Sequence, residues 1–115
     1  MDINKVILAG HLTRDPELSN LPSGAVCNFT VAVNYRYRTT NRERKDEVAF
    51  VACVACGGTA DIIVRYFSKG KPILVEGRIK TESWEDGNGK RQHKTRVWVE
   101  NIQFIDNKNT GNNNS

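Results

Sequence analysis

A strand, a helix and a second strand are predicted in succession by residues 47–80, EVAFVACVACGGTADIIVRYFSKGKPILVEGRIK. Both alternating sets of side chains in residues 47–56 are apolar: Val48, Phe50, Ala52 and Val54 form one set, and Ala49, Val51, Cys53 and Ala55 form the other. Successive side chains of a strand point to opposite faces of its sheet. The run therefore predicts a strand that is covered on both faces.

The segment that follows has the signals of one short helix. Gly57 and Gly58 break the strand, and Thr59 is of a residue type that caps helix N-termini. Apolar residues then recur at helical spacing, and Lys69 with Gly70 predicts the end of the helix. Residues 72–80 return to strand-like alternation.

Three further strands are predicted outside this segment, at residues 4–12, 25–35 and about 93–105. The sequence Asp86-Gly87-Asn88-Gly89 is a strong hairpin signal between the last two strands. Five strands with one short helix between the third and the fourth match the all-β, Greek-key barrel called the OB-fold. A sandwich would need about seven strands.

The length of 115 residues allows one hydrophobic core, which we assign to a single domain at residues 1–106. Residues 107–115 carry no apolar side chain and are expected to form a disordered polar tail. No apolar run approaches the ~20 residues of a membrane span, and no export signal is visible, so we expect no membrane association. The odd set Cys27, Cys53 and Cys56 indicates reduced thiols in the cytoplasm.

Positive charge is concentrated in two places. Residues 36–45 hold five cations and one acid, a local charge of +4 that equals the formal net charge of the chain. Such a cluster attracts polyanions, although a basic loop that only aids solubility would have the same composition. The candidate phosphate contacts are Arg36, Arg38, Arg42, Arg44 and Lys45 in this cluster, and Lys69, Lys71, Arg78 and Lys80 around the fourth strand.

Aromatic residues accompany these cations. In Tyr35-Arg36-Tyr37-Arg38 the two rings share one face of a strand and the two guanidinium groups the other. Trp84 lies in a polar stretch beside the hairpin tip, where a core tryptophan has little to pack against. Trp98 is expected to point outward with Arg96 and Glu100. Rings that stack on bases beside cations that meet phosphates are typical of a single-stranded nucleic-acid surface, whereas amphipathic packing remains the alternative for a tyrosine at a strand end.

Other chemistry has little support in the sequence. Cys53 and Cys56 have the spacing of a redox pair, and the three cysteines with His11 and His93 could ligate zinc. An odd separation, however, places the two thiols on opposite faces of a strand. No phosphate-binding glycine loop, nucleophile elbow or paired carboxylate site is present. We therefore expect no metal, no cofactor and no enzymatic activity.

Several segments resemble bacterial single-stranded DNA-binding proteins in order and spacing over about residues 2–105. They are Asn4-Lys5-Val6-Ile7-Leu8-Ala9-Gly10-His11-Leu12-Thr13-Arg14-Asp15-Pro16-Glu17, Asn28-Phe29-Thr30-Val31-Ala32-Val33, Tyr66-Phe67-Ser68-Lys69-Gly70-Lys71-Pro72-Ile73-Leu74-Val75-Glu76-Gly77-Arg78 and Ser83-Trp84-Glu85-Asp86. That family has the OB-fold, and the resemblance implies sequence-independent binding and protection of single-stranded DNA in replication, recombination and repair.

The resemblance also implies a set of site residues. The base-stacking aromatics of the family fall on Tyr37, Phe50 and Trp84, whereas a fourth falls on Cys56, which leaves a gap in the stacking track. The family further implies a homo-oligomer, a tetramer, in the bacterial cytosol and nucleoid. Many members end in an acidic, hydrophobic tip that recruits repair and replication enzymes, and no such tip follows Asp106. An RNA-binding OB or cold-shock-type module remains the alternative, because stacking and charge do not read the 2′-hydroxyl.

Overall fold

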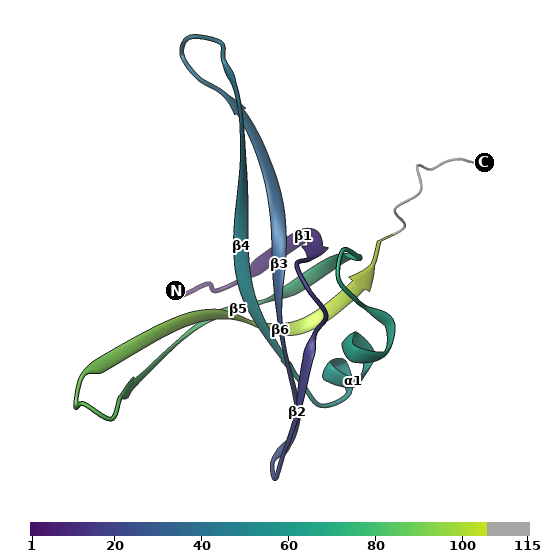
Figure 1. Cartoon of the computed structure of the whole chain (residues 1–115), viewed down its shortest axis with the longest axis vertical. Helices are drawn as coiled ribbons and strands as arrows, with labels where there is room; N and C mark the ends of the chain where they lie inside the picture. The colour runs from purple at the N-terminus through teal and green to yellow at the C-terminus, as the bar shows by residue number, and fades with distance from the viewer. Residues whose placement is uncertain (106–115) are drawn as a thin grey trace.

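The computed structural model describes residues 1–105, which form six strands and one helix (Figure 1). The strands are β1 (Val6–Leu12), β2 (Glu17–Leu21), β3 (Gly24–Arg38), β4 (Arg44–Cys56), β5 (Pro72–Glu85) and β6 (Arg91–Phe104). The helix α1 (Gly57–Tyr66) connects β4 to β5. The tail predicted at residues 107–115 lies outside the described residues. Within residues 1–105, no helix is long and apolar enough to cross a membrane.

Five of the strands close into a barrel. The pairing order is β1-β5-β6-β4-β3, and β3 returns to β1 through His11↔Ala32 and Leu12↔Val31. β4 and β6 pair in parallel over two residues only, Cys53↔Val97 and Val54↔Trp98, and the other pairings are antiparallel. The predicted OB-fold, with its helix between the third and fourth barrel strands, is confirmed.

The strand β2 was not predicted. Glu17–Leu21 pairs with β3 through Glu17↔Asn28 to Leu21↔Gly24, so a short hairpin precedes the strand predicted at residues 25–35. All five side chains of β2 are exposed. A strand without a buried face has no apolar alternation, and this is why the sequence pattern missed it.

The barrel interior is filled by one side of the strands and capped by α1. The buried core comprises Leu12, Cys27, Phe29, Val31, Cys53, Ala55, Ala60, Ile63, Phe67, Ile73, Val75 and Val97. Ile63 and Phe67 lie four residues apart, so both point into the barrel from one side of the helical turn. Phe67 also stacks on Phe104 of β6, with ring centroids 4.9 Å apart.

The predicted start of the helix is wrong by three residues. α1 begins at Gly57, and Cys56 rather than Thr59 occupies the N-cap position without a side-chain hydrogen bond. Gly57 has a φ of 62°, a conformation that glycine adopts without steric cost. The chain therefore turns from β4 directly into the helix and does not need a capping threonine.

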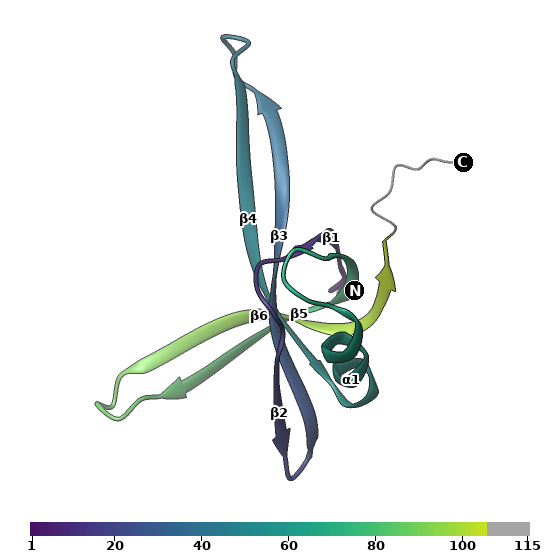
Figure 2. The same cartoon turned by 45° about the vertical axis from the view of Figure 1, so that its right-hand side comes forward.

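Two hairpins extend beyond the barrel in different directions (Figures 1 and 2). We call residues 32–50 the β3–β4 arm and residues 78–96 the β5–β6 arm. The prediction that residues 47–56 are covered on both faces is wrong for the first half of that run, since every residue from 47 to 50 is exposed. Burial on both faces holds for residues 53–55, where β4 is still part of the barrel.

Two glycines allow close backbone approaches in the barrel. A Cβ atom on Gly10 would overlap the carbonyl of Ala32, and one on Gly77 would overlap the carbonyl of Trp98. Gly10 adjoins the place where β1 passes from β5 to β3, and Gly77 lies at the register shift between β5 and β6. Neither position has room for a side chain unless the backbone moves.

We predict that Gly10→Ala and Gly77→Ala each lower the free energy of unfolding by ~1–3 kcal/mol, the usual cost of overpacking. Thermal unfolding followed by circular dichroism measures the effect. Gly58→Ala is the matched control: apart from its own helical turn, no atom of residues 1–105 lies within 4 Å of the added Cβ, and alanine favours helix over glycine by up to ~1 kcal/mol. Equal losses in all three variants would contradict the role assigned to the two barrel glycines.

Candidate nucleic-acid interface

Strand alternation gives β3, β4 and the β5–β6 arm one shared outer face. The core side chains of β3 and β4, such as Phe29 and Cys53, are odd-numbered, so even-numbered residues lie on the outside of the barrel. Cross-strand pairs extend this face from strand to strand: Ala32↔Phe50, Asn28↔Val54, Val54↔Trp98, Lys80↔Arg96 and Trp84↔Gln92. We call this surface the outer face. It runs from Phe50 on one arm to Trp84 on the other.

Phe50 is the most exposed ring on the outer face, with 69% of its surface accessible. Beside it lies a mainly apolar groove of about 430 Å³, lined by His11, Leu12, Thr13, Ala32, Asn34, Val48, Phe50, Lys69 and Gly70. The loop that carries Lys69 is held in place because the Lys69 backbone N–H donates to Asp15 Oδ1 at 2.9 Å. The structure thus places one predicted cation, Lys69, next to one predicted stacking ring.

Trp84 occupies the other end of the outer face and is exposed, as predicted. The turn beyond it is held by Asp86, whose Oδ1 accepts the backbone N–H groups of Asn88 at 2.9 Å and Lys90 at 3.0 Å. These hydrogen bonds, the one from Lys90 most of all, lower the pKa of the Asp86 carboxyl. Oδ2 of Asp86 also accepts from Gln92, the cross-strand partner of Trp84. The hairpin tip is therefore ordered around this ring.

Tyr37 lies on the opposite face of the β3–β4 arm from Phe50. Phe50 pairs with Ala32, five residues before Tyr37, and an odd separation along a strand reverses the face. Tyr37 stacks on Tyr35, and its hydroxyl donates to Glu47 Oε2 at 3.3 Å. The negative charge of Glu47 raises the pKa of Tyr37. The structure thus brings Phe50 and Trp84 onto one surface and leaves Tyr37 on another.

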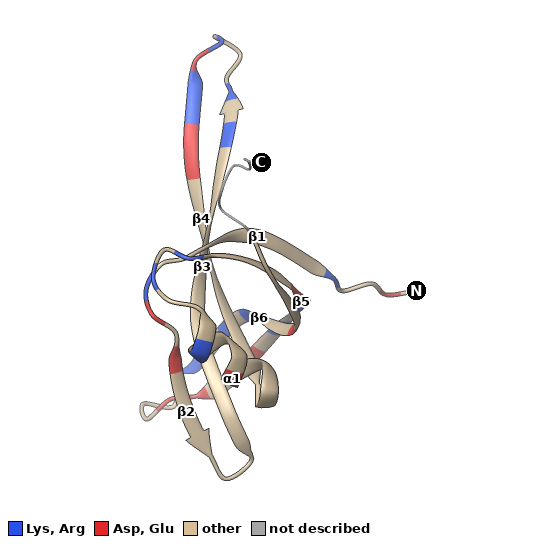
Figure 3. Ribbon diagram, turned by 90° about the vertical axis from the view of Figure 1, so that its right-hand side faces the viewer, with Lys and Arg blue, Asp and Glu red and all other residues tan. Residues whose placement is uncertain are grey.

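The basic cluster of residues 36–45 occupies the outer half of the β3–β4 arm (Figure 3). Arg36, Arg38 and Arg44 share the outer face with Phe50, whereas Lys45 pairs with Tyr37 on the other face. Arg42 lies in the connecting turn with a φ of 65°. The ion pairs here, Arg36–Asp46 at 3.5 Å and Lys45–Glu43 at 3.8 Å, are solvent-exposed and therefore weak. The cations remain available to a ligand.

Arg78 and Lys80 lie on the outer face of β5, while Lys71 precedes β5 in the loop after α1. Arg78 pairs with Glu100 at 3.1 Å. Lys80 Nζ lies 3.9 Å from the centre of the Trp98 ring, a cation–π contact. Trp98 is on the outer face as predicted, but it is half-buried, and its buried indole N–H has no hydrogen-bond partner among residues 1–105. The ring is therefore less accessible than Phe50 or Trp84.

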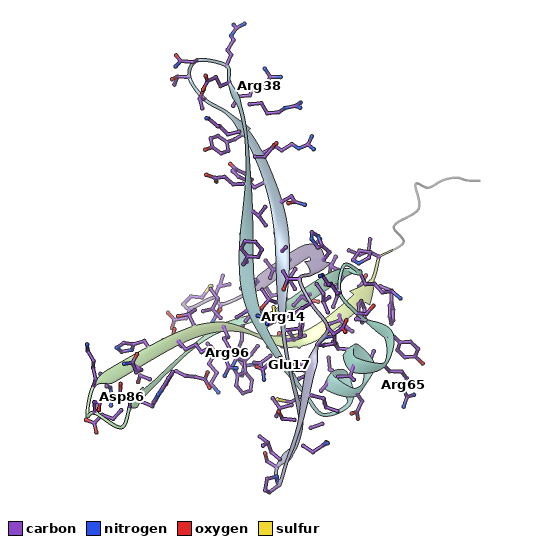
Figure 4. All side chains as sticks on the ribbon, viewed as in Figure 1. Arg14, Glu17, Arg38, Arg65, Asp86 and Arg96 are labelled. Carbon is purple, nitrogen blue, oxygen red and sulfur yellow. The ribbon has the colours of Figure 1, made fainter. Side chains whose placement is uncertain are left out.

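Three cations of the outer region were not predicted as site residues: Arg14, Lys94 and Arg96. Together with Asp15, Glu17, Asn28, Phe29, Thr30, Ala52 and Cys53 they line a cavity of about 360 Å³ on the outside of the barrel. Figure 4 shows Arg14, Glu17 and Arg96 near the point where the two arms separate. Lys94 and Arg96 have the same parity on their strand as the outward Trp98, which is the signal that could have identified them.

The three cysteines are free thiols in different environments. Burial raises the pKa of Cys27 to about 11 and that of Cys53 to about 12. Cys56 is exposed at the end of β4, so the prediction that Cys53 and Cys56 lie on opposite faces is confirmed. Among residues 1–105, no group of three or more histidine, cysteine or acidic side chains could hold a metal ion.

These features define an OB-fold protein whose outer face combines exposed aromatic rings with arginine and lysine side chains. Comparison with known proteins agrees: the model of the Single-strand binding protein family matches residues 3–105. The chain belongs to this family.

Individual relatives cover most of the chain. A single-stranded DNA-binding protein of Wolinella succinogenes is 45% identical over 106 residues, which is 91% of this chain and 65% of the relative. One from Clostridium perfringens is 42% identical over 111 residues, 95% of this chain and 70% of the relative. This chain thus spans about two thirds of the length of these relatives.

A solved structure described as a Plasmodium falciparum SSB complex with ssDNA has the same fold. It superimposes with a TM-score of 0.84 at 25% sequence identity. The match covers 92% of this chain and 97% of the other.

Proposed function

We propose that this protein binds and protects single-stranded DNA without sequence preference during replication, recombination and repair. The observation that carries the proposal is the outer face, where Phe50 and Trp84 are exposed, Lys69 lies in the groove beside Phe50, and Lys80 lies on the face of β5 that carries Trp84. The names of the bacterial relatives and the DNA complex of the structural neighbour support the same ligand. The protein acts by binding alone and catalyses no reaction.

The binding mechanism follows from the chemistry of the outer face. Bases stack on Phe50 and Trp84, and such stacking tolerates any sequence because every base presents a π-face. Phosphates meet the guanidinium and ammonium groups of the basic cluster at residues 36–45 and of Lys69, Lys71, Arg78 and Lys80. To bind a phosphate, Arg78 gives up its ion pair with Glu100, and Lys80 gives up its cation–π contact with Trp98.

Tyr37 requires a longer path. It lies on the other face of the β3–β4 arm, five residues or about 16 Å along the strand from the Phe50 position. DNA that contacts both rings must pass around an edge of the arm. Tyr37 therefore contributes to the binding of long oligonucleotides, while short ones use the outer face between Phe50 and Trp84.

The surface of β1 supports a homo-oligomer, which we propose is a tetramer. β1 pairs with β5 from Val6 to His11 but with β3 only at His11 and Leu12, so much of one strand edge is free within residues 1–105. Ile7 on this strand is 63% exposed. A free edge beside an exposed apolar side chain favours pairing with another chain. The three free thiols are consistent with the reducing bacterial cytosol, where we place the protein.

We predict that Trp84→Ala weakens binding of oligo-dT about 10- to 100-fold, because base-on-ring stacking is worth ~1–3 kcal/mol. Phe50→Ala and, for long oligonucleotides, Tyr37→Ala have effects of the same order. Fluorescence anisotropy of a labelled oligo-dT measures the affinity, and circular dichroism checks that each variant is folded.

Intrinsic fluorescence provides the matched comparison. Trp84→Phe removes most of the DNA-induced quenching and keeps partial affinity, while Trp98→Phe retains the quenching because Trp98 is half-buried beneath Lys80. If Trp98→Phe abolishes the quenching and Trp84→Ala binds like the parent, the DNA does not cross the β5–β6 arm.

Salt dependence tests the electrostatic contribution. We expect the logarithm of the association constant to fall with the logarithm of salt concentration, with a slope of about 0.7 for each phosphate contact. Titrations with dT and rU oligonucleotides of equal length, and with duplex DNA, define the ligand. A flat salt response would exclude the phosphate contacts, and tighter binding of rU than dT would favour an RNA-binding module.

Light scattering measures the oligomer. We expect a mass of four chains at micromolar concentration, and Ile7→Glu should lower it because the substitution places a charge on the exposed β1 surface. A mass of one chain for the parent protein would refute the proposed assembly.

A further inference from the structure

Arg96 lies at the base of the β5–β6 arm, where β6 leaves the barrel (Figure 4). The parallel pairing of β6 with β4 covers Val97 and Trp98 and does not include Arg96. Only 17% of the Arg96 side chain is exposed. This burial distinguishes Arg96 from Arg14 and Lys94 in the same cavity, whose side chains are exposed.

The guanidinium of Arg96 is engaged on two sides. Nη1 donates to Asn28 Oδ1 of β3 at 2.9 Å, and Nε donates to Glu82 Oε1 of β5 at 3.2 Å. Nη2 donates to the same Glu82 oxygen. Glu82 thus balances the charge of Arg96, and the planar fork of donors is directed at protein groups rather than at solvent. Arg96 is poorly placed to act as a phosphate ligand.

The hydrogen bond to Asn28 joins the two halves of the molecule. Asn28 is paired with Val54, so the Arg96 side chain spans β4 to reach β3. Backbone pairing between β4 and β6 extends over only two residue pairs. On the opposite side, β1 holds β5 up to Gly77, and Asn4 exchanges two hydrogen bonds with the backbone of Ile79. On the β4 side the arm has only the two backbone pairs, so the Arg96 side chain supplies the bridge that restricts a pivot toward or away from β3.

The direction of the β5–β6 arm determines the geometry of the outer face. Phe50 belongs to the β3–β4 arm and Trp84 to the β5–β6 arm, so the angle between the arms sets the distance between the two rings. That distance fixes how many nucleotides a strand needs to reach both rings. A bridge that holds the arm reduces the ordering required when DNA binds.

We propose that Arg96, held by Asn28 and Glu82, is a positioning residue that sets the direction of the β5–β6 arm and thereby the spacing of Phe50 and Trp84. The consequence for DNA rests on the proposed function, whereas the effect on the arm does not. The two parts are tested separately.

The arm is tested without DNA. Spin labels are attached to cysteines introduced at Asn41 and Asn88, the tips of the two arms. Cys56→Ser removes the exposed native thiol, and excess unlabelled chain keeps two labelled chains from meeting in one oligomer. The distribution of distances between the two labels is then measured. Asn28→Ala broadens the distribution, and Asn28→Asp, which retains an acceptor oxygen, restores it. Asn34→Ala, on the same face of β3 but six residues away, is the matched control. Equal distributions for parent and Asn28→Ala would overturn the proposal.

The consequence for DNA is tested with a dT length series. For the shortest oligonucleotide that quenches Trp84 fluorescence, Asn28→Ala lowers the affinity several-fold. The affinity for long oligonucleotides falls less, and the slope of the salt dependence is unchanged. Arg96→Met behaves in the same way. If Arg96→Met instead lowers the slope by about 0.7, Arg96 is a phosphate contact and the proposal is wrong. Failure of the parent protein to bind dT would refute the proposed function and leave the arm measurement as the test of the bridge.

Discussion

Closure of a five-stranded barrel by very few residue pairs is the constraint on which the rest of this structure depends. β1 reaches β3 through two residue pairs, and β4 reaches β6 through two more. Gly10 and Gly77 permit the close backbone approaches near these crossings. Strands of 13 to 15 residues are longer than so small a barrel can use, so β3 with β4 and β5 with β6 continue outward as paired arms.

In the two arms, side chains continue to alternate between faces as they do in the barrel, but both faces are exposed to solvent. Inside the barrel, the odd-numbered residues of β3 and β4 form the core and the even-numbered residues form the outside. Beyond the barrel neither face is covered, and Phe50 and Tyr37 become accessible on opposite sides of one arm. A single two-residue period thus generates both the core and the two ring-bearing surfaces.

The charged side chains of the two arms differ in how far they are exposed to solvent. The cations of the β3–β4 arm make long, solvent-exposed ion pairs that cost little to exchange for a phosphate. The Arg96 side chain is mostly buried and is hydrogen-bonded to Glu82 and Asn28, which suits a positioning role. Under the two proposals Arg36 serves binding and Arg96 serves architecture, and the two side chains differ in burial.

The sequence by itself determined the five barrel strands in their order along the chain, the position of the helix, the hairpin at Asp86 and the exposure of Trp84. Periodicity and turn chemistry are local properties, so these features can be read without the tertiary structure. It did not reveal β2, whose side chains are all exposed, or the helix start at Gly57, which depends on a backbone angle. Only the tertiary structure decided that Phe50 and Trp84 share a face without Tyr37, and that Arg96 meets Asn28, 68 positions away in the chain. Cross-strand register and barrel closure bring such residues together, and neither leaves a local trace in the sequence.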